Sequence, residues 1–291
     1  MEELPGDPLI KTITPEETVQ IVATIFSAHF PNHDAGFFSA ILHQVQNVFA
    51  GAYPGYQRCD TAFHDFAHTC QATVATVRIL DGHLKSGRPP ALTPREFQLA
   101  VVGILLHDIG FSKETGDDSG TGAKHTIAHV DRGERFAAKF HPHFGGTPDE
   151  VRMVQLTIRS TTMNVAMSQL PFRDEHEHLI GCAAGTGDIL GTMAVPDYPE
   201  RLPGLYQELA EAAAYAGPRA KEVTRYRSAE DLLRKTRDFY HSYVQRMLEE
   251  QWGRIYKALE YHFADGRNHY LQAIETNLAR IDRILVTTKE K

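Results

Sequence analysis

VVGILLHDIGF, residues 101–111, is an apolar run that ends at His107 and Asp108 and is stopped by Gly110. A segment that is apolar on every side is buried, so an imidazole and a carboxylate at its end are buried as well. Burying a carboxylate is costly unless it is paired or binds a cation, and the neighbouring histidine is a suitable co-ligand. We therefore predict half of a metal site at the end of this run.

Three His-Asp pairs occur in the chain, at 33–34, 64–65 and 107–108, whereas about one is expected by chance at this composition. The pair at 33–34 lies between Pro31 and Gly36, a context typical of a polar turn between helices. The other two pairs, at 64–65 and 107–108, are candidates for a functional site.

Helix starts are marked by three Thr-Pro-x-Glu segments, each with threonine as the N-cap, proline at the first helical position and glutamate three residues after the cap. They lie at 14–17, 93–96 and 147–150. They predict helices from 14 to about 28, from 93 to His107, and from 147 toward Arg159. Apolar periodicity predicts further helices at about 37–49, 63–80 and 125–140.

The remainder of the chain, 197–291, is also helical by pattern. We predict one long helix over about 228–263, a break at 264–266 and a final helix that ends near Leu285. No segment has the alternation of a strand, and no internal repeat or linker is visible. The predicted fold is all-α and a single domain, whose C-terminal helices pack on the bundle or form a homodimer.

Composition limits the classes of function. The chain has 291 residues, of which 42% are hydrophobic and 23% charged, as in a soluble globular protein. A net charge of −7 argues against binding of a nucleic-acid polymer. Three cysteines without a CxxC favour reduced thiols and a cytoplasmic location. The start MEELPGDPLI does not resemble a signal peptide, and no apolar run predicts a membrane span.

Two histidines precede the central run. In the helix predicted at 63–80, His68 recurs with Ala72, Ala75 and Ile79 on one face, so it is expected to be buried. His64 lies four residues earlier, on the same face of that predicted helix. Two histidines with this spacing can address one centre.

Further polar residues follow the central run. His129 lies on the apolar face of the helix at 125–140, whereas His125 lies in its first turn. Asp188 is the single acid in the small, apolar segment 180–193, where a carboxylate needs a partner. The polar loop 112–124 is a lid candidate, and 165–180, with its DEHEH segment, is expected to be irregular and solvated.

The buried-face ligands are imidazoles and carboxylates without a thiolate: His68, His107, Asp108 and Asp188, with His64 and His129 nearby. Such a set suits Mg, Mn, Fe, Co or Zn in a catalytic site and argues against a closed structural zinc site. Asp108 has two oxygens and can bridge two ions, an arrangement that clamps an in-line phosphoryl displacement.

Four segments carry a resemblance to a known family. FHDFAH at 63–68, LLHDIG at 105–110, HVDRGERFA at 129–137 and GDILGTM at 187–193 resemble, in this order, the HD-domain superfamily of metal-dependent phosphohydrolases. The first is similar to the YHNxxH element of the cyclic nucleotide phosphodiesterases. The resemblance covers about 55–200 and leaves 201–291 as a C-terminal helical extension.

The resemblance implies roles for individual residues. It implies that His68, His107, Asp108 and Asp188 hold a first divalent metal, that Asp108 bridges to a second, and that His64 is the general acid. His129 lies where many members have a histidine that binds the second metal, although Val130 replaces the proline that follows there.

The chain also departs from its relatives. Where HD-GYP proteins complete a dinuclear site with tandem histidines or acids, this sequence has Arg159-Ser160-Thr161. A guanidinium cannot ligate a cation but can grip a phosphate, so we predict that Arg159 and Lys113 bind substrate phosphate, with Lys124 and Arg132 as further candidates. The purine-selecting glutamine and the aromatic clamp of the phosphodiesterases have no identifiable counterpart.

The sequence therefore predicts a metal-dependent phosphohydrolase that acts on a small phosphate ester or nucleotide, with a cyclic-nucleotide-type phosphodiester as the favoured substrate. Two alternatives stay open. One is a di-iron oxygenase, which the same fold can host and which needs five or six protein ligands. The other is a regulatory module that binds a nucleotide without hydrolysing it.

Overall fold

The computed structural model describes residues 9–163, 165–223 and 225–289. This part of the chain consists of helices and loops, and its one β-bridge is the isolated pair Tyr56 and Glu114. The prediction of an all-α fold is confirmed. The prediction that the chain start is not a signal peptide falls largely on residues 1–8, which lie outside the described residues.

The described helices are α1 (Pro15–His29), α2 (Gly36–Phe49), α3 (Phe66–Ser86), α4 (Pro94–Leu106), α5 (His129–Phe140), α6 (Pro148–Ser160), α7 (Glu175–Ala194), α8 (Tyr198–Tyr215), α9 (Ala229–Phe239), α10 (Leu259–His262) and α11 (His269–Lys289). Short helical turns connect several of them, among which η1 (Ile109–Phe111) and η2 (Gly122–His125) lie near the site. The three predicted helix starts are confirmed, because Thr14, Thr93 and Thr147 each form a capping box.

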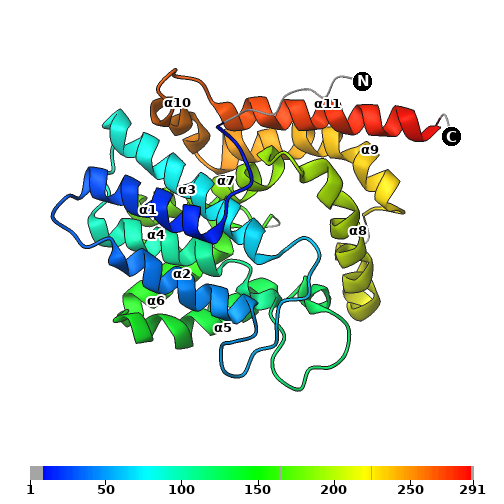
Figure 1. Ribbon diagram of the computed structural model, residues 1–291, viewed down its shortest axis with the longest axis horizontal. Helices are drawn as coiled ribbons and strands as arrows, with labels where there is room; N and C mark the ends of the chain where they lie inside the picture. The colour runs from blue at the N-terminus through cyan, green and yellow to red at the C-terminus, as the bar shows by residue number, and fades with distance from the viewer. Residues whose placement is uncertain (1–8, 164, 224, 290–291) are drawn as a thin grey trace.

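Helices α3 and α7 lie side by side in the centre of the molecule (Figure 1). Helices α1, α4 and α10 pack on α3, and α6 and α11 pack on α7. A Cβ atom at Gly187 would lie 2.0 Å from Thr76 Oγ1 and 2.7 Å from the Thr76 backbone nitrogen, so this glycine permits the close approach. The small residues of α7 thereby bring the neighbouring Asp188 next to α3.

One predicted helix is not continuous. The chain over 228–263 begins as α9 and continues in the π-helical turns η6 (Tyr240–Val244) and η7 (Met247–Gln251). It then breaks at Gly253 and Arg254, whose φ angles are 57° and 59°. Two consecutive left-handed residues cannot continue a right-handed helix, so the prediction of one long helix was wrong. The predicted break at 264–266 lies between α10 and α11 and is confirmed.

The DEHEH segment was predicted to be irregular, and this was wrong as well. Asp174 accepts hydrogen bonds from the backbone nitrogens of His176 and Glu177 and so caps the start of α7. The two histidines of the segment lie in the first turns of that helix, where His178 is exposed. The sequence already contained this cap, since aspartate is among the preferred N-cap residues.

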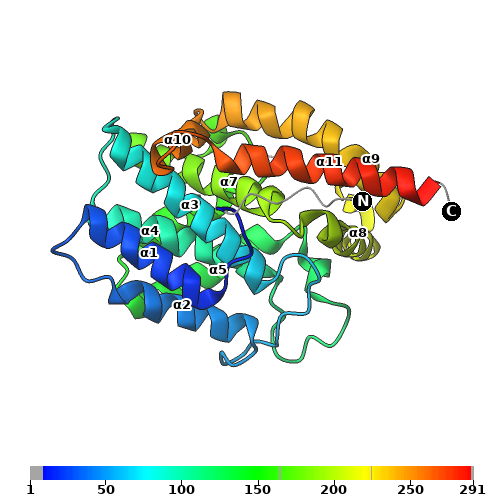
Figure 2. The same cartoon turned by 45° about the horizontal axis from the view of Figure 1, so that its top comes forward.

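The C-terminal helices cover one end and one side of the bundle (Figure 2). Helix α11 packs along α9 and on α7, and α8 contacts η2 and α9. The extension is thus joined to the site-bearing helices, whereas the homodimer stays a prediction. Among the described residues, no single helix has the length and apolar composition to cross a membrane; α7 and α8 meet the test only as a pair, which is bent by 114°.

Candidate metal centre

Three helices bring the predicted ligands together. His68 lies in the first turn of α3, His107 and Asp108 follow the last turn of α4, and Asp188 lies on α7. The Nε2 atoms of His68 and His107 are 3.1 Å apart, and each lies 3.4 Å from Asp188 Oδ1. Asp108 Oδ2 lies 3.0 Å from His68 Nε2 and 3.2 Å from His107 Nε2. Four side chains from three distant segments of the chain therefore lie close together.

The tautomer of each histidine follows from its other ring nitrogen. His107 Nδ1 donates a hydrogen bond to the Ile104 carbonyl at 2.8 Å, which leaves Nε2 with its lone pair. The hydroxyl of Thr192 donates its single proton to the Asp188 carbonyl, so it accepts from His68 Nδ1 at 3.1 Å. Both Nε2 lone pairs consequently face the same point.

This arrangement suits a divalent cation. Two imidazole lone pairs and two carboxylates repel one another when they converge, and a cation at their centre turns that repulsion into coordination. Asp108 Oδ2 is buried and has no hydrogen-bond partner. A buried carboxylate oxygen without a donor is expected where a metal ion takes the place of the donor.

Protons take the role of a counter-charge where no cation is bound. Burial opposes a charged His107, but the carboxylates of Asp108 and Asp188 prevail and raise its pKa well above its usual value. Burial likewise opposes ionisation of Asp108, yet the adjacent His107 and His64 hold its pKa well below the usual range. The cluster therefore favours bound positive charge, and a metal ion would bind by displacing protons.

The position of His64 in the backbone differs from the predicted one. It precedes Asp65, the N-cap of α3, so the prediction that both histidines share a helical face was wrong. Its Nδ1 atom lies 2.5 Å from Glu208 Oε2, while Glu208 Oε1 accepts from the backbone nitrogens of Phe63 and His64 at 2.6 and 3.2 Å. A glutamate of α8 thus holds both the ring and the backbone of His64.

Glu208 is a site residue that the sequence analysis missed. It is 3% exposed and lies on the buried face of α8, four residues before Ala212, which is 1% exposed. Its position on a buried helical face is the same signal that identified His68, and it could have been found in that way. Burial opposes a charged His64, but Glu208 in the first place, with Asp108 and Asp188, raises the pKa of His64 to about 9.

His129 lies at the start of α5 and faces the cluster. Its Nε2 atom is 3.8 Å from Asp108 Oδ1, and its Nδ1 atom donates to the Thr126 carbonyl at 2.6 Å. Burial lowers the pKa of His129, which keeps the ring neutral and its Nε2 lone pair available. His125, the alternative in this segment, pairs with Asp117 in the loop instead.

The two predicted phosphate-binding residues are engaged elsewhere. Arg159 makes a two-pronged ion pair with Glu134 and a further one, at 3.1 Å, with Asp131. Lys113 pairs with Asp60 at 2.8 Å and donates to the Gly120 carbonyl at 2.8 Å. Because a carboxylate already balances each charge, a substrate phosphate would have to compete with it, and both roles stay predictions.

The loop 112–124, predicted as a lid, is tied down at both ends. Gln57 donates its backbone N–H to the Lys113 carbonyl and its side-chain amide to the carbonyls of Glu114 and Asp117. At the other end, the backbone nitrogen and the hydroxyl of Thr121 both donate to Glu211 of α8. The loop is therefore anchored to Gln57 at one end and to α8 at the other.

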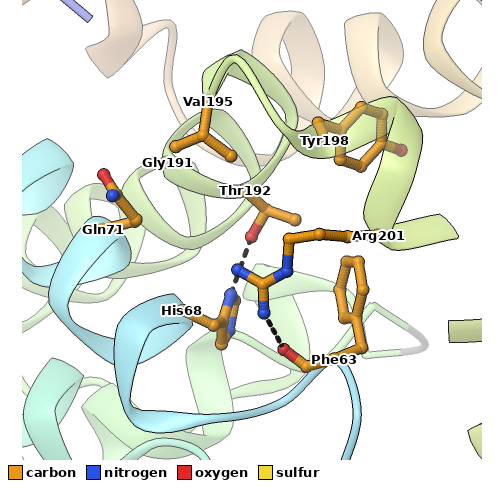
Figure 3. A pocket seen from close by; sticks show the side chains of 8 residues that line it. All are labelled: Phe63, His68, Gln71, Gly191, Thr192, Val195, Tyr198 and Arg201. Atoms are coloured by element: carbon orange, nitrogen blue, oxygen red, sulfur yellow. Dashed lines mark hydrogen bonds between the residues drawn. The ribbon is translucent and has the colours of Figure 1, made fainter. Parts of the chain in front are cut away.

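A small pocket lies on the Thr192 side of His68, with Arg201 of α8 at its edge (Figure 3). The Arg201 guanidinium donates to the Phe63 carbonyl, pairs with Asp65 at 3.0 Å and lies over the Phe63 ring. The residues that line the pocket are Phe63, His68, Gln71, Gly191, Thr192, Val195, Tyr198 and Arg201. Arg201 and Glu208 of α8 thus hold the peptide of Phe63, next to His64, by its carbonyl and its N–H.

Comparison of the chain with models of known protein families and with curated proteins gave no match. The resemblance to HD-domain phosphohydrolases consequently depends on the four sequence segments and on the convergence of their histidines and carboxylates. The chemistry of this cluster is therefore the main indication of function.

Proposed function

We propose that this protein is a metal-dependent phosphohydrolase of the HD type that hydrolyses a small phosphate ester, with a cyclic-nucleotide-type phosphodiester as the first substrate class to test. One observation carries the proposal. The Nε2 atoms of His68 and His107 each lie 3.0–3.4 Å from a carboxylate oxygen of Asp108 and from one of Asp188. Asp108 Oδ1 and His129 Nε2 offer an adjacent second position.

A divalent ion bound by this cluster would polarise a phosphoryl oxygen and lower the pKa of a bound water. The residues of the chain supply the remaining functions. His68 and His107 are held in one tautomer by Thr192 and by the Ile104 carbonyl, so their ligand atoms need no rearrangement. Such preorganisation contributes to both metal affinity and rate.

His64 is proposed to protonate the oxygen of the leaving group. The general acid has to carry a proton before the reaction, and the pKa of about 9 keeps His64 protonated at neutral pH. Glu208 stabilises that imidazolium and binds the ring at Nδ1, which leaves Nε2 free of this contact. The side chain of His64 is 22% exposed, so a substrate can reach it.

The Glu208→Gln variant is expected to shift the pH profile of the reaction. A general acid is active below its pKa, and Glu208 raises the pKa of His64, so the alkaline limb of wild-type kcat is expected above the ordinary histidine value. Removing the Glu208 charge lowers that pKa toward the ordinary value of about 6.5. Activity above about pH 7 is then lost, while activity at lower pH is retained.

Glu211→Gln is the matched control for this prediction. Glu211 lies one turn further along α8 and binds Thr121 instead of His64. Measurement of kcat against pH for both variants tests whether Glu208 sets the pKa of His64. An alkaline limb that stays in place in Glu208→Gln would remove His64 from the role of general acid.

The proposed function is tested by metal analysis of the purified protein together with hydrolysis assays. The substrate panel comprises cyclic nucleotides, nucleoside monophosphates and a chromogenic phosphodiester, each with Mg²⁺, Mn²⁺, Fe²⁺, Co²⁺ and Zn²⁺. Metal-dependent release of phosphate or of a nucleotide supports the proposal. Iron-dependent uptake of oxygen would instead indicate the oxygenase, and nucleotide binding without any turnover would indicate the regulatory module.

A further inference from the structure

Three aromatic rings form a stack at the edge of the cluster. Phe111 is 1% exposed and lies in η1, three residues after Asp108. The ring of His64 stacks on one face of Phe111, with centroids 4.6 Å apart and planes 8° apart. The ring of His129 stacks on the other face, also at 4.6 Å, with planes 18° apart.

The stack is held from several sides. Arg132 donates to the carbonyls of Gly110 and Ser112, each at 2.7 Å, and these two carbonyls flank Phe111 in the chain. His64 is attached at its Nδ1 atom to Glu208, and His129 at its Nδ1 atom to the Thr126 carbonyl. The phenyl ring is therefore fixed in its backbone, and each imidazole is fixed at one atom.

A tether at Nδ1 alone does not fix the direction of Nε2. The terminal torsion of a histidine is broad, so the ring can tilt about its hydrogen bond. A flat aromatic face at stacking distance removes that tilt for both rings. Both imidazoles then remain parallel to the phenyl ring and separated by its thickness.

We propose that Phe111 is a positioning residue that holds the imidazoles of His64 and His129 parallel and apart, so that each keeps its Nε2 edge available to the cluster. The consequence for catalysis rests on the proposed function, in which His64 delivers the proton and His129 completes the second ion position. The stack itself, and its effect on metal affinity, do not depend on that function.

The surroundings of Phe111 differ from those of an ordinary core phenylalanine. Phe97, which is 0% exposed, contacts the phenyl rings of Phe26, Phe30 and Phe38 in tilted and edge-to-face geometry. Both ring contacts described for Phe111 are stacked, and both are with imidazoles of the site. Phe97→Leu is therefore a matched control, because it removes a buried phenyl ring of the same size away from the histidines.

The first measurement is the NMR spectrum of the histidine rings in the metal-free protein. Protons above the face of an aromatic ring resonate upfield of their normal position. In the wild type we expect upfield ring signals for both His64 and His129, and in Phe111→Leu both sets should move downfield. Phe97→Leu should leave them in place. Unchanged histidine signals in Phe111→Leu would overturn the proposal.

The second measurement is the affinity for Mn²⁺ by calorimetry, followed by steady-state kinetics on any substrate found. We expect Phe111→Leu to weaken binding of the second ion and to lower kcat, each by about 10–100-fold, with KM little changed. Phe97→Leu should lower thermal stability without either effect. Altered histidine signals with unchanged Mn²⁺ affinity and kcat would show that Phe111 contributes only to core packing, and this would overturn its proposed positioning role.

These two readouts separate the inference from the proposed function. If the wild type hydrolyses no phosphate ester, the proposed function fails, while the histidine signals and the Mn²⁺ affinity still decide the role of Phe111. If the wild type is active and Phe111→Leu is equally active, the proposed function stands and the inference fails.

Discussion

Asp108→Ala is expected to retain no tightly bound divalent ion and to lose hydrolysis of phosphate esters. The substitution removes both oxygens of Asp108, Oδ2 near His68 and His107 and Oδ1 toward His129, which would connect the two proposed ion positions. Loss of an outer-shell partner costs about 10–100-fold in affinity or activity, and loss of a bridging ligand should exceed that. Elemental analysis of the purified variant and its kcat/KM measure the two effects.

The His-Asp pair at 33–34 offers a matched control. Asp34 is exposed, and its Oδ1 atom accepts a hydrogen bond from the Gly36 backbone nitrogen at 2.8 Å, at the start of α2. Asp34→Ala should lower stability slightly and leave metal content and activity unchanged. Wild-type metal content in Asp108→Ala would mean that the ions bind elsewhere, and the proposed function would then fail.

The predicted site residues that the structure brings together share one property. His68 lies on a helical face whose other predicted members are apolar, and Asp188 is the single acid of the small, apolar segment 180–193; a polar group in such a setting demands a partner. The apolar run before His107 carries the same information. Because each of these signals lies within a few helical turns, the burial of His68, His107 and Asp108 could be anticipated without knowing how the helices pack.

Local reasoning could have marked Glu208 as a buried acid, but it could not have identified Glu208 as the partner of His64. Glu208 is 144 residues away from His64, and nothing near His64 in the sequence indicates which helix will reach it. The same holds for the Phe111 stack, which forms between segments that are distant in the sequence. Periodicity within one helix predicts which face is buried, but the partner on the other side is set by tertiary packing.

Backbone geometry accounts for most of the errors in the fold. The long helix predicted over 228–263 breaks where Gly253 and the non-glycine Arg254 both adopt positive φ. Arginine rarely adopts a positive φ, and its good helix propensity does not predict a break in a helix. The start of α3 was placed too early because the Asp65 cap was read as part of the helix.

Gly110→Ala is expected to displace His129 from the cluster. A Cβ atom at position 110 would lie 1.8 Å from the carbonyl oxygen of His129 and 2.9 Å from the backbone nitrogen of Gly133, so no side-chain movement relieves the clash. Helix α5 then has to move away from η1. We expect the free energy of unfolding to fall by about 1–3 kcal/mol and affinity for the second ion to fall by about 10–100-fold.

Gly133→Ala is the matched control, because it adds the same methyl group to α5, about one turn after His129. Its Cβ atom would lie 3.4 Å from the Leu106 carbonyl oxygen and 3.5 Å from Ile158 Cγ2, which is ordinary contact. Alanine is favoured over glycine within a helix, so this variant should be about 0.4–1 kcal/mol more stable than the wild type. The two substitutions are thus expected to change the melting temperature in opposite directions. Equal stability and equal Mn²⁺ affinity in both would show that the contact between η1 and α5 does not hold His129 in place.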